Sequence, residues 1–168
     1  MSEDYEENEF PLAYLITFRT YGTWLHGDER TSVSRQSKGI IDINLPLKEH
    51  MEAEMTGKSV ILDRAQSLVI QDSVKEVCKH RNYTLYAVNI RSNHGHAVIG
   101  AKIKPERIAD ALKAYSTRRL REAGLIAADV RVWSRGRSRK YLWKTRHLDA
   151  AIDYVLYCQS DLPFELED

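Results

Sequence analysis

The sequence predicts an α+β fold in which helices pack on one face of an antiparallel sheet. Short runs rich in β-branched and aromatic residues alternate with longer segments whose apolar residues recur at intervals of three and four. The composition supports a folded chain, because 43% of its 168 residues are hydrophobic and 29% are charged. A chain of this length is expected to form one domain with a substantial core.

The N-terminal third is predicted as a strand, a long irregular segment and a helix. The run LAYLITFRTYG at residues 12–22 ends at a glycine and is typical of a buried strand. Residues 22–58 show little periodicity, and a short strand is expected at 59–63. From Asp63 to about His80 the apolar residues recur at helical spacing, which predicts a helix.

The middle of the chain is predicted as two strands followed by a helix. Residues 83–90 and 96–102 form runs of strand type joined by the polar residues RSN, which indicates a hairpin-like pairing. The helix at 104–124 has the clearest signals of the chain, because Pro105 stands at its start and Gly124 at its end.

The C-terminal part completes a recognisable order of elements. Short strands at 130–134 and 140–144 are predicted on either side of a turn with the sequence RGRSR, and a last helix is predicted at 146–159. Strand, helix, strand, strand, helix and strand is the order of a ferredoxin-like antiparallel sheet with helices packed on one face.

The chain is expected to form a single domain at residues 11–162, between an acidic tail at 1–10 and a short C-terminal tail at 163–168. Its two cysteines lie far apart, so no disulfide framework is implied and a reducing cytoplasm is the simplest setting. The N-terminus lacks the basic start and apolar centre of a secretory signal. No apolar run approaches the roughly 20 residues needed to span a bilayer, so no membrane partner is expected.

The charge of the chain is distributed unevenly. Residues 102–146 carry 14 Lys and Arg against 4 Asp and Glu, whereas the remainder carries 11 against 20, although the net charge is only +1. A basic segment of this size indicates a polyanionic partner such as nucleic acid. The alternative is a solvated basic face without a partner.

A pair of histidines is the first candidate for chemistry. His94 and His96 are two residues apart in a strand-like run, and side chains at this spacing point to the same face of a strand. They could therefore bind one cation and leave coordination positions open, as catalytic sites do. By spacing alone, however, two such histidines are more often incidental than metal ligands.

Five segments together extend this observation. In order, they are YLITFRTYGTWLHGDER (14–30), VNIRSNHGHAVI (88–99), LKAYSTRRLREAG (112–124), VWSRGRSRKYLW (132–143) and AIDYVLYCQ (151–159). In these segments the chain resembles the single-tyrosine HUH transposases of bacterial insertion sequences, and especially their REP-associated tyrosine transposase relatives.

The resemblance implies a metal-dependent endonuclease and strand transferase that acts on single-stranded DNA beside a hairpin. Mg²⁺ or Mn²⁺ on His94 and His96 would polarise the scissile phosphate. Tyr154, on the C-terminal helix, would be the nucleophile and form a 5′-phosphotyrosine bond. Tyr115 and Tyr157 are the other candidates among nine tyrosines, and Tyr115 lies in an apolar helix face that favours a packing role. A homodimer with exchanged C-terminal helices is compatible with the sequence.

Two positions depart from the family pattern. The third ligand is expected four residues after the tyrosine, but Gln159 follows Tyr154 at five, so it would face another side of the helix. Gly95 stands where the family has a bulky aliphatic residue between the histidines. The missing side chain would cost about 2–4 kcal/mol if a cavity remained, unless a bulkier residue on a facing helix fills the space.

The basic segments are then expected to hold DNA through phosphate contacts, with Trp133, Tyr141 and Trp143 available to stack on unpaired bases. Trp133 and Trp143 could equally be core residues of their strands. The residues predicted to bind DNA are Lys113, Arg118, Arg119, Arg121, Arg135, Arg137, Arg139 and Lys140.

Two other functions remain compatible with the sequence. One is a ferredoxin-like nucleic-acid-binding protein without catalysis, in which Tyr83 and Tyr86 on a central strand would stack on bases. The other is a hydrolase that uses the two histidines with water as the nucleophile. A hydrolase would tolerate Tyr154→Phe, and a binding protein would tolerate loss of either histidine as well.

Overall fold

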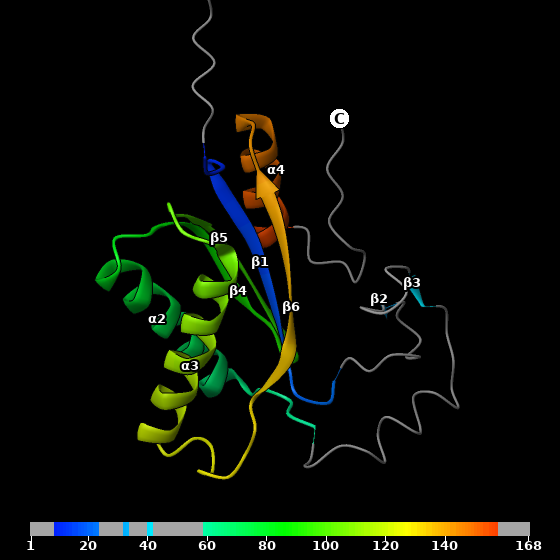
Figure 1. Ribbon diagram of the computed structural model, residues 1–168. Coiled ribbons are helices and arrows are strands. Elements are labelled where there is room, and N and C mark those ends of the chain that lie inside the picture. The colour runs from blue at the N-terminus through cyan, green and yellow to red at the C-terminus, as the bar shows by residue number, and fades with distance from the viewer. Residues whose placement is uncertain (1–8, 24–31, 34–39, 42–58, 158–168) are drawn as a thin grey trace, which may run out of the picture.

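The computed structural model describes residues 9–23, 32–33, 40–41 and 59–157. The main sheet is antiparallel and has the strand order β4-β5-β1-β6, which is the ferredoxin-like order that the sequence predicts. Figure 1 shows this sheet, whose strands are β1 (Ala13–Thr20), β4 (Thr84–Ile90), β5 (His94–Gly100) and β6 (Trp133–Leu142). A separate pair consists of β2 (Ser32–Val33) and β3 (Ile40–Ile41).

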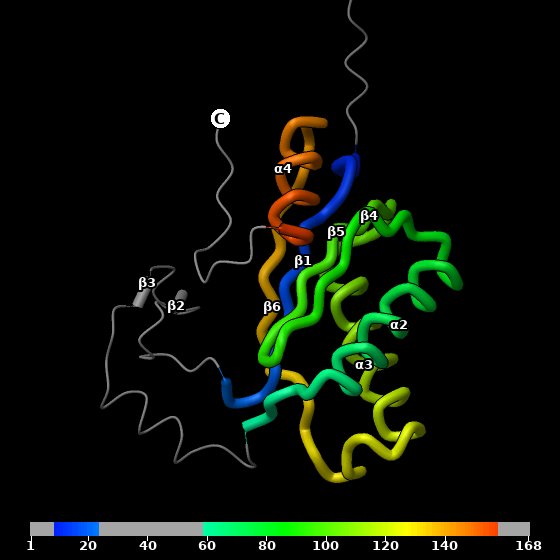
Figure 2. The backbone as a smooth tube through the Cα atoms, turned by 180° about the vertical axis from the view of Figure 1, so that it is seen from behind, coloured from blue at the N-terminus to red at the C-terminus, as the bar shows by residue number. Residues whose placement is uncertain are grey.

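Helices lie on both faces of the main sheet. The two longer helices, α2 (Arg64–His80) and α3 (Pro105–Glu122), cover one face together, as the sequence predicts. The C-terminal helix α4 (Thr145–Leu156) packs on the opposite face. Figures 1 and 2, which view the molecule from opposite sides, both place α2 and α3 on one side of the strands and α4 on the other. None of the described helices is long and apolar enough to cross a membrane.

Local sequence signals account for the helix boundaries. Asp63 accepts a hydrogen bond from the backbone of Gln66, whose side chain in turn accepts one from the backbone of Asp63, and this capping box begins α2. Pro105 begins α3, where its missing N–H has no helical partner to lose. After the end of α3, Gly124 adopts a φ of 68°, a left-handed conformation that glycine accepts without strain.

Alternation along the strands divides the apolar residues between two cores. Tyr14, Ile16 and Phe18 of β1 point toward α2 and α3, whereas Ala13 and Leu15 point toward α4. The smaller core under α4 also contains Ala87, Val98, Leu142, Ala151 and Val155. Strand β1 is therefore buried on both faces, which explains its almost continuous apolar sequence.

Several predicted boundaries differ from the structure. The segment predicted as two short strands around a turn is one continuous strand, β6, because it pairs with β1 from Ala13 opposite Leu142 to Phe18 opposite Arg137. Residues 59–63 form no strand, although the Val60 N–H donates to the Tyr21 carbonyl at 2.9 Å. The strand predicted to begin at residue 96 begins at His94. The last helix, predicted to reach residue 159, ends at Leu156. Residues 1–8 of the predicted N-terminal tail and the predicted C-terminal tail lie outside the described residues.

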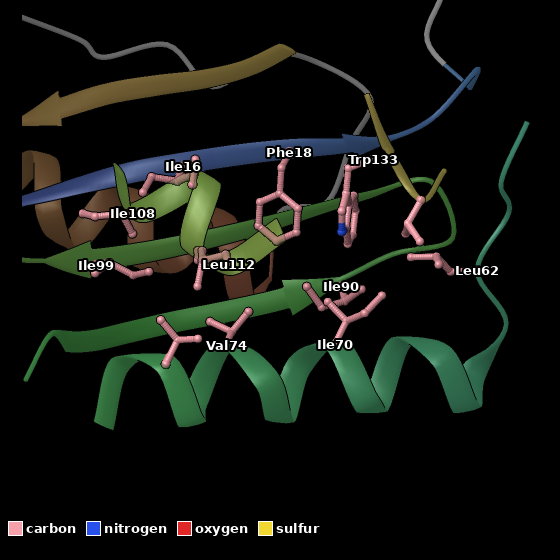
Figure 3. Packing of buried hydrophobic residues seen from close by; sticks show 14 of the residues in the cluster. Ile16, Phe18, Leu62, Ile70, Val74, Ile90, Ile99, Ile108, Leu112 and Trp133 are labelled. Carbon is pink, nitrogen blue, oxygen red and sulfur yellow. The ribbon is translucent and has the colours of Figure 1, made fainter. Parts of the chain in front are cut away.

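The space left by Gly95 is filled, but not from a helix as the sequence suggested. A Cβ atom on Gly95 would lie 2.8 Å from Ile90 Cδ1 and 2.8 Å from Phe18 Cζ. Phe18 is the direct partner of Gly95 on β1, and its ring packs edge-on against Trp133 at 4.9 Å. Figure 3 shows Phe18, Ile90 and Trp133 together in the core beside α2. The volume missing from one strand is thus supplied by its neighbours.

Gly95→Val is therefore expected to overpack the core and lower the free energy of unfolding by about 1–3 kcal/mol. The ring of Phe18 has no room to retreat, because it is fully buried against Trp133. Adding Phe18→Leu should recover most of the loss, and chemical denaturation of the two single variants and the double variant measures this coupling. A valine variant as stable as the wild type would show that the packing around Gly95 is looser than described.

Candidate active site

Strand β5 places the two histidines on the face of the sheet that α4 covers. His94 and His96 share the strand parity of Val98, which belongs to the core under α4. Their rings pack edge to face with centroids 4.7 Å apart. Two imidazoles this close on one strand can direct nitrogen atoms toward a single cation.

Hydrogen bonds from neighbouring residues orient both imidazoles. Thr17, the partner of His96 on β1, places its Oγ1 2.8 Å from Nδ1 of His96 in a buried contact. This contact leaves Nε2 of His96 as the nitrogen for a cation. The Nδ1 atom of His94 lies 2.6 Å from Oδ1 of Asn93. Thr20 at the end of β1 donates its N–H to the Asn93 carbonyl at 2.9 Å, so the turn before His94 is also held.

Burial keeps His96 neutral. Its side chain is 7% exposed, and desolvation together with the charges of His94, Arg19 and Arg91 lowers its pKa from 6.5 to about 3. A neutral imidazole is the form that binds a metal ion. The residues present therefore fit a divalent cation, although the described residues contain no cluster of three or more His, Cys, Asp or Glu.

Helix α4 carries Tyr154 to the histidines. Ala151 and Val155, one turn apart, are fully buried and attach one side of the helix to the sheet. Tyr154 is partly buried beside them, and its ring packs edge-on against His96 with a centroid distance of 5.3 Å. Near the helix end, the Asn89 amide of β4 donates to the Val155 carbonyl at 3.2 Å.

The other two candidate tyrosines lie elsewhere. Tyr115 packs against the core on the α2 and α3 side, and its hydroxyl donates to Glu76 at 2.9 Å. Tyr157, just beyond the end of α4, is 77% exposed. Of the three candidate tyrosines, Tyr154 packs against His96. No described contact joins Tyr115 or Tyr157 to His96.

Two arginines that sequence reasoning missed lie close to the histidines. Arg19 is the partner of His94 on β1, and Arg91 donates its backbone N–H to the His94 carbonyl at 2.7 Å in the hairpin turn. Both charges contribute to the lowered pKa of His96. Only the strand register could have found them, because neither belongs to the basic segment at 102–146.

Most of the residues predicted to bind DNA lie on the opposite side of the sheet. Lys113 donates to the Ser134 and Gly136 carbonyls at 2.9 Å each, and Arg121 donates to the Val130 carbonyl at 3.3 Å. Lys140 instead has the strand parity of Leu142 and faces α4. Acidic residues pair with several others: Arg118 and Arg119 with Glu122, Arg119 with Glu76, Arg137 with Asp110, and Arg139 with Glu106. Arg135 is exposed.

The aromatic candidates divide between core and surface. Trp133 is buried, and its indole N–H donates to Ser116 at 3.1 Å, so it is a core residue. Tyr141 and Trp143 are 41% and 49% exposed and nearly parallel, with centroids 6.5 Å apart. The strand that carries Tyr86 is an edge strand, β4, and not a central one as the sequence suggested. Gln159 lies outside the described residues.

Residues 50–154 match the family of IS200-like transposases, which is more than half of the chain and includes both histidines and Tyr154. The chain therefore belongs to this transposase family, as the sequence motifs indicate. Membership makes it a DNA-processing enzyme of transposition.

Two solved structures are similar to the chain, and the first of them supports the fold. The structure of a REP-associated tyrosine transposase bound to a REP hairpin is similar with a TM-score of 0.51 and 12% identity, over 92% of this chain and 70% of that one. A proposed transposase from Deinococcus radiodurans R1 has a TM-score of 0.47 and 15% identity, over 89% of this chain and 92% of that one. No curated protein sequence matches the chain significantly.

The buried neutral His96 makes stability depend on pH. Because its pKa is lower in the folded than in the unfolded chain, the unfolded state binds more protons between about pH 3 and pH 6.5. The stabilisation is complete above pH 6.5 and is lost as the pH falls. In EDTA, we expect the free energy of unfolding to fall more between pH 7 and pH 5 for the wild type than for His96→Gln. Equal losses, measured by chemical denaturation, would contradict this assignment.

Proposed function

We propose that the protein is a metal-dependent single-stranded DNA endonuclease and strand transferase that forms a 5′-phosphotyrosine intermediate on Tyr154. The observation that carries this proposal is the contact of Tyr154 with His96 on the same face of the sheet as His94. The transposase family of the chain supports the choice of DNA as the substrate.

His94 and His96 would hold Mg²⁺ or Mn²⁺, with Gln159 as a further candidate ligand. When bound, the cation supplies a Lewis acid that polarises the scissile phosphate. Thr17 keeps the His96 ring in one orientation, and burial together with nearby positive charges keeps its imidazole neutral.

Tyr154 would supply the nucleophile. Its phenol loses a proton to solvent, the phenolate oxygen attacks the phosphorus atom, and the bond from phosphorus to the 3′ oxygen breaks. The departing 3′ oxygen takes a proton from solvent. The products are a 5′-phosphate ester of Tyr154 and a free 3′-hydroxyl group. Because one phosphodiester replaces another, a 3′-hydroxyl can later reverse the step and join strands without a nucleotide cofactor.

Two groups of basic residues would hold the DNA, one beside the histidines and one farther from them. Arg19, Arg91 and Lys140 lie on or beside the α4 face and are suited to phosphates of the cleaved strand. Arg118 on α3 and Arg135 on β6 are exposed and are candidates for more distant phosphates, as in a hairpin stem. The hairpin bound by the REP-associated tyrosine transposase supports a hairpin beside the single strand as the partner.

A covalent-adduct assay tests the chemistry. Protein is mixed with a 3′-labelled single-stranded oligonucleotide library rich in hairpins, in Mn²⁺ or EDTA. We expect a Mn²⁺-dependent labelled protein band that Tyr154→Phe and His96→Ala abolish and that Tyr157→Phe, the matched control, retains.

The same assay separates the alternatives. Cleavage without an adduct that survives Tyr154→Phe would identify water as the nucleophile, and DNA binding without cleavage would identify a binding protein. A mixture of the Tyr154→Phe and His96→Ala variants should remain inactive if each chain uses its own α4. Recovered activity would indicate a homodimer with exchanged helices.

The contact of Thr17 with His96 predicts an effect on metal binding. Thr17→Val keeps the shape of the side chain and removes the hydroxyl, so the imidazole loses its fixed orientation and Mn²⁺ affinity should fall about tenfold or more. Electron paramagnetic resonance of free Mn²⁺ measures this affinity without any DNA. Thr117→Val, which removes a hydroxyl from α3, is the control and should leave the affinity unchanged.

A further inference from the structure

Asn89 lies on the edge strand β4, beside His96 on the α4 face of the sheet. It is the partner of His96 on β4, just as Thr17 is the partner of His96 on β1. Thr17, His96 and Asn89 therefore form one row across three strands, and their side chains share a face. Directly paired residues of an antiparallel sheet have Cβ atoms about 4.5–5.5 Å apart, so Asn89 is an immediate neighbour of His96.

The side chain of Asn89 contacts the helix that carries the tyrosine. Its amide donates a 3.2 Å hydrogen bond to the carbonyl of Val155, the residue after Tyr154. This carbonyl lies in the last turn of α4, which ends at Leu156. The bond is partly buried, so water competes with it less than at a free helix end.

A directional contact is needed at this place. Ala151 and Val155 attach α4 to the sheet through apolar contacts, which do not prescribe one rotation or one height of the helix. A hydrogen bond loses its energy steeply when its angle changes, so the bond from Asn89 selects one placement of the helix end. That placement is the one in which the Tyr154 ring meets His96 at 5.3 Å.

We propose that Asn89 is a positioning residue that holds the nucleophile Tyr154 against His96 by fixing the C-terminal turn of α4. The proposal rests on the proposed function, because it assigns to Asn89 the alignment of that reaction. Asn89 acts through the backbone of Val155 and contributes no atom to the bond that is broken.

The test compares Asn89→Leu with Gln66→Leu in the full-length protein. Gln66 is the control, because its amide also joins two elements by donating to a carbonyl, that of Leu125 at 2.9 Å, on the opposite side of the sheet. Its replacement also breaks the capping box of α2, so the control loses at least as many hydrogen bonds as Asn89→Leu. Three quantities are measured: hydrogen exchange of the Val155, Leu156 and Tyr157 amides in EDTA, Mn²⁺ affinity, and the rate of adduct formation at saturating DNA. If Asn89→Leu does not fold, the same three quantities are measured for Asn89→Ala.

In Asn89→Leu we expect exchange of these amides to rise about three- to tenfold and the adduct rate to fall about tenfold. Mn²⁺ and DNA affinities should change less than twofold, and Gln66→Leu should leave both the exchange and the adduct rate unchanged. Unchanged exchange in Asn89→Leu would overturn the proposal, and so would a loss of Mn²⁺ affinity large enough to explain the slower reaction.

Failure of the proposed function gives a different result. If the wild type forms no adduct, the phosphotyrosine chemistry is wrong, yet the exchange comparison still decides whether Asn89 holds the end of α4. If the wild type forms an adduct and Asn89→Leu forms it at the same rate, the chemistry stands and the positioning role is rejected.

Discussion

Strand β5 is hydrogen-bonded on both sides, to β1 and to β4, and this double pairing fixes which way each of its side chains points. His94 and His96 face α4, while Gly95 and Ala97 face the core beside α2 and α3. A shift of one residue would exchange the two sets and bury the histidines among aliphatic side chains. The candidate site therefore depends on a register that the core on the other face enforces.

The packing around Gly95 shows how the core on the other face supports this register. Phe18 and Ile90 fill the space that a larger residue between the histidines would take, and Trp133 packs against the Phe18 ring. The ladder between β1 and β5 continues through Gly95 without interruption. The departure of Gly95 from the family pattern is thus accompanied by a compensating ring on the adjacent strand. We infer that glycine at this position does not by itself loosen the histidine pair.

The charges are arranged differently from what their order in the sequence indicates. Several arginines of the basic segment at 102–146 form ion pairs within the fold, with Glu76 of α2 and with Glu106 and Asp110 of the segment itself. Exposed pairs of this kind contribute little to stability, and DNA phosphates could displace the acidic partners. Two arginines whose charges act on His96, Arg19 and Arg91, come instead from the acidic remainder of the chain.

The sequence by itself determined the elements whose signals are local. The capping residue Asp63, the first-turn Pro105 and the apolar run of β1 predict their elements within a few residues, and the motif around His94 and His96 indicates the family. Strand β6 was predicted in two pieces because RGRSR contains residues that favour a turn. In the structure, pairing with β1 keeps this segment extended. Only the tertiary structure decided that Thr17 and Asn89 flank His96, that α4 lies on the face opposite α2 and α3, and that Phe18 fills the place of Gly95. These contacts join residues far apart in the chain, and no periodicity in one segment encodes its register against another.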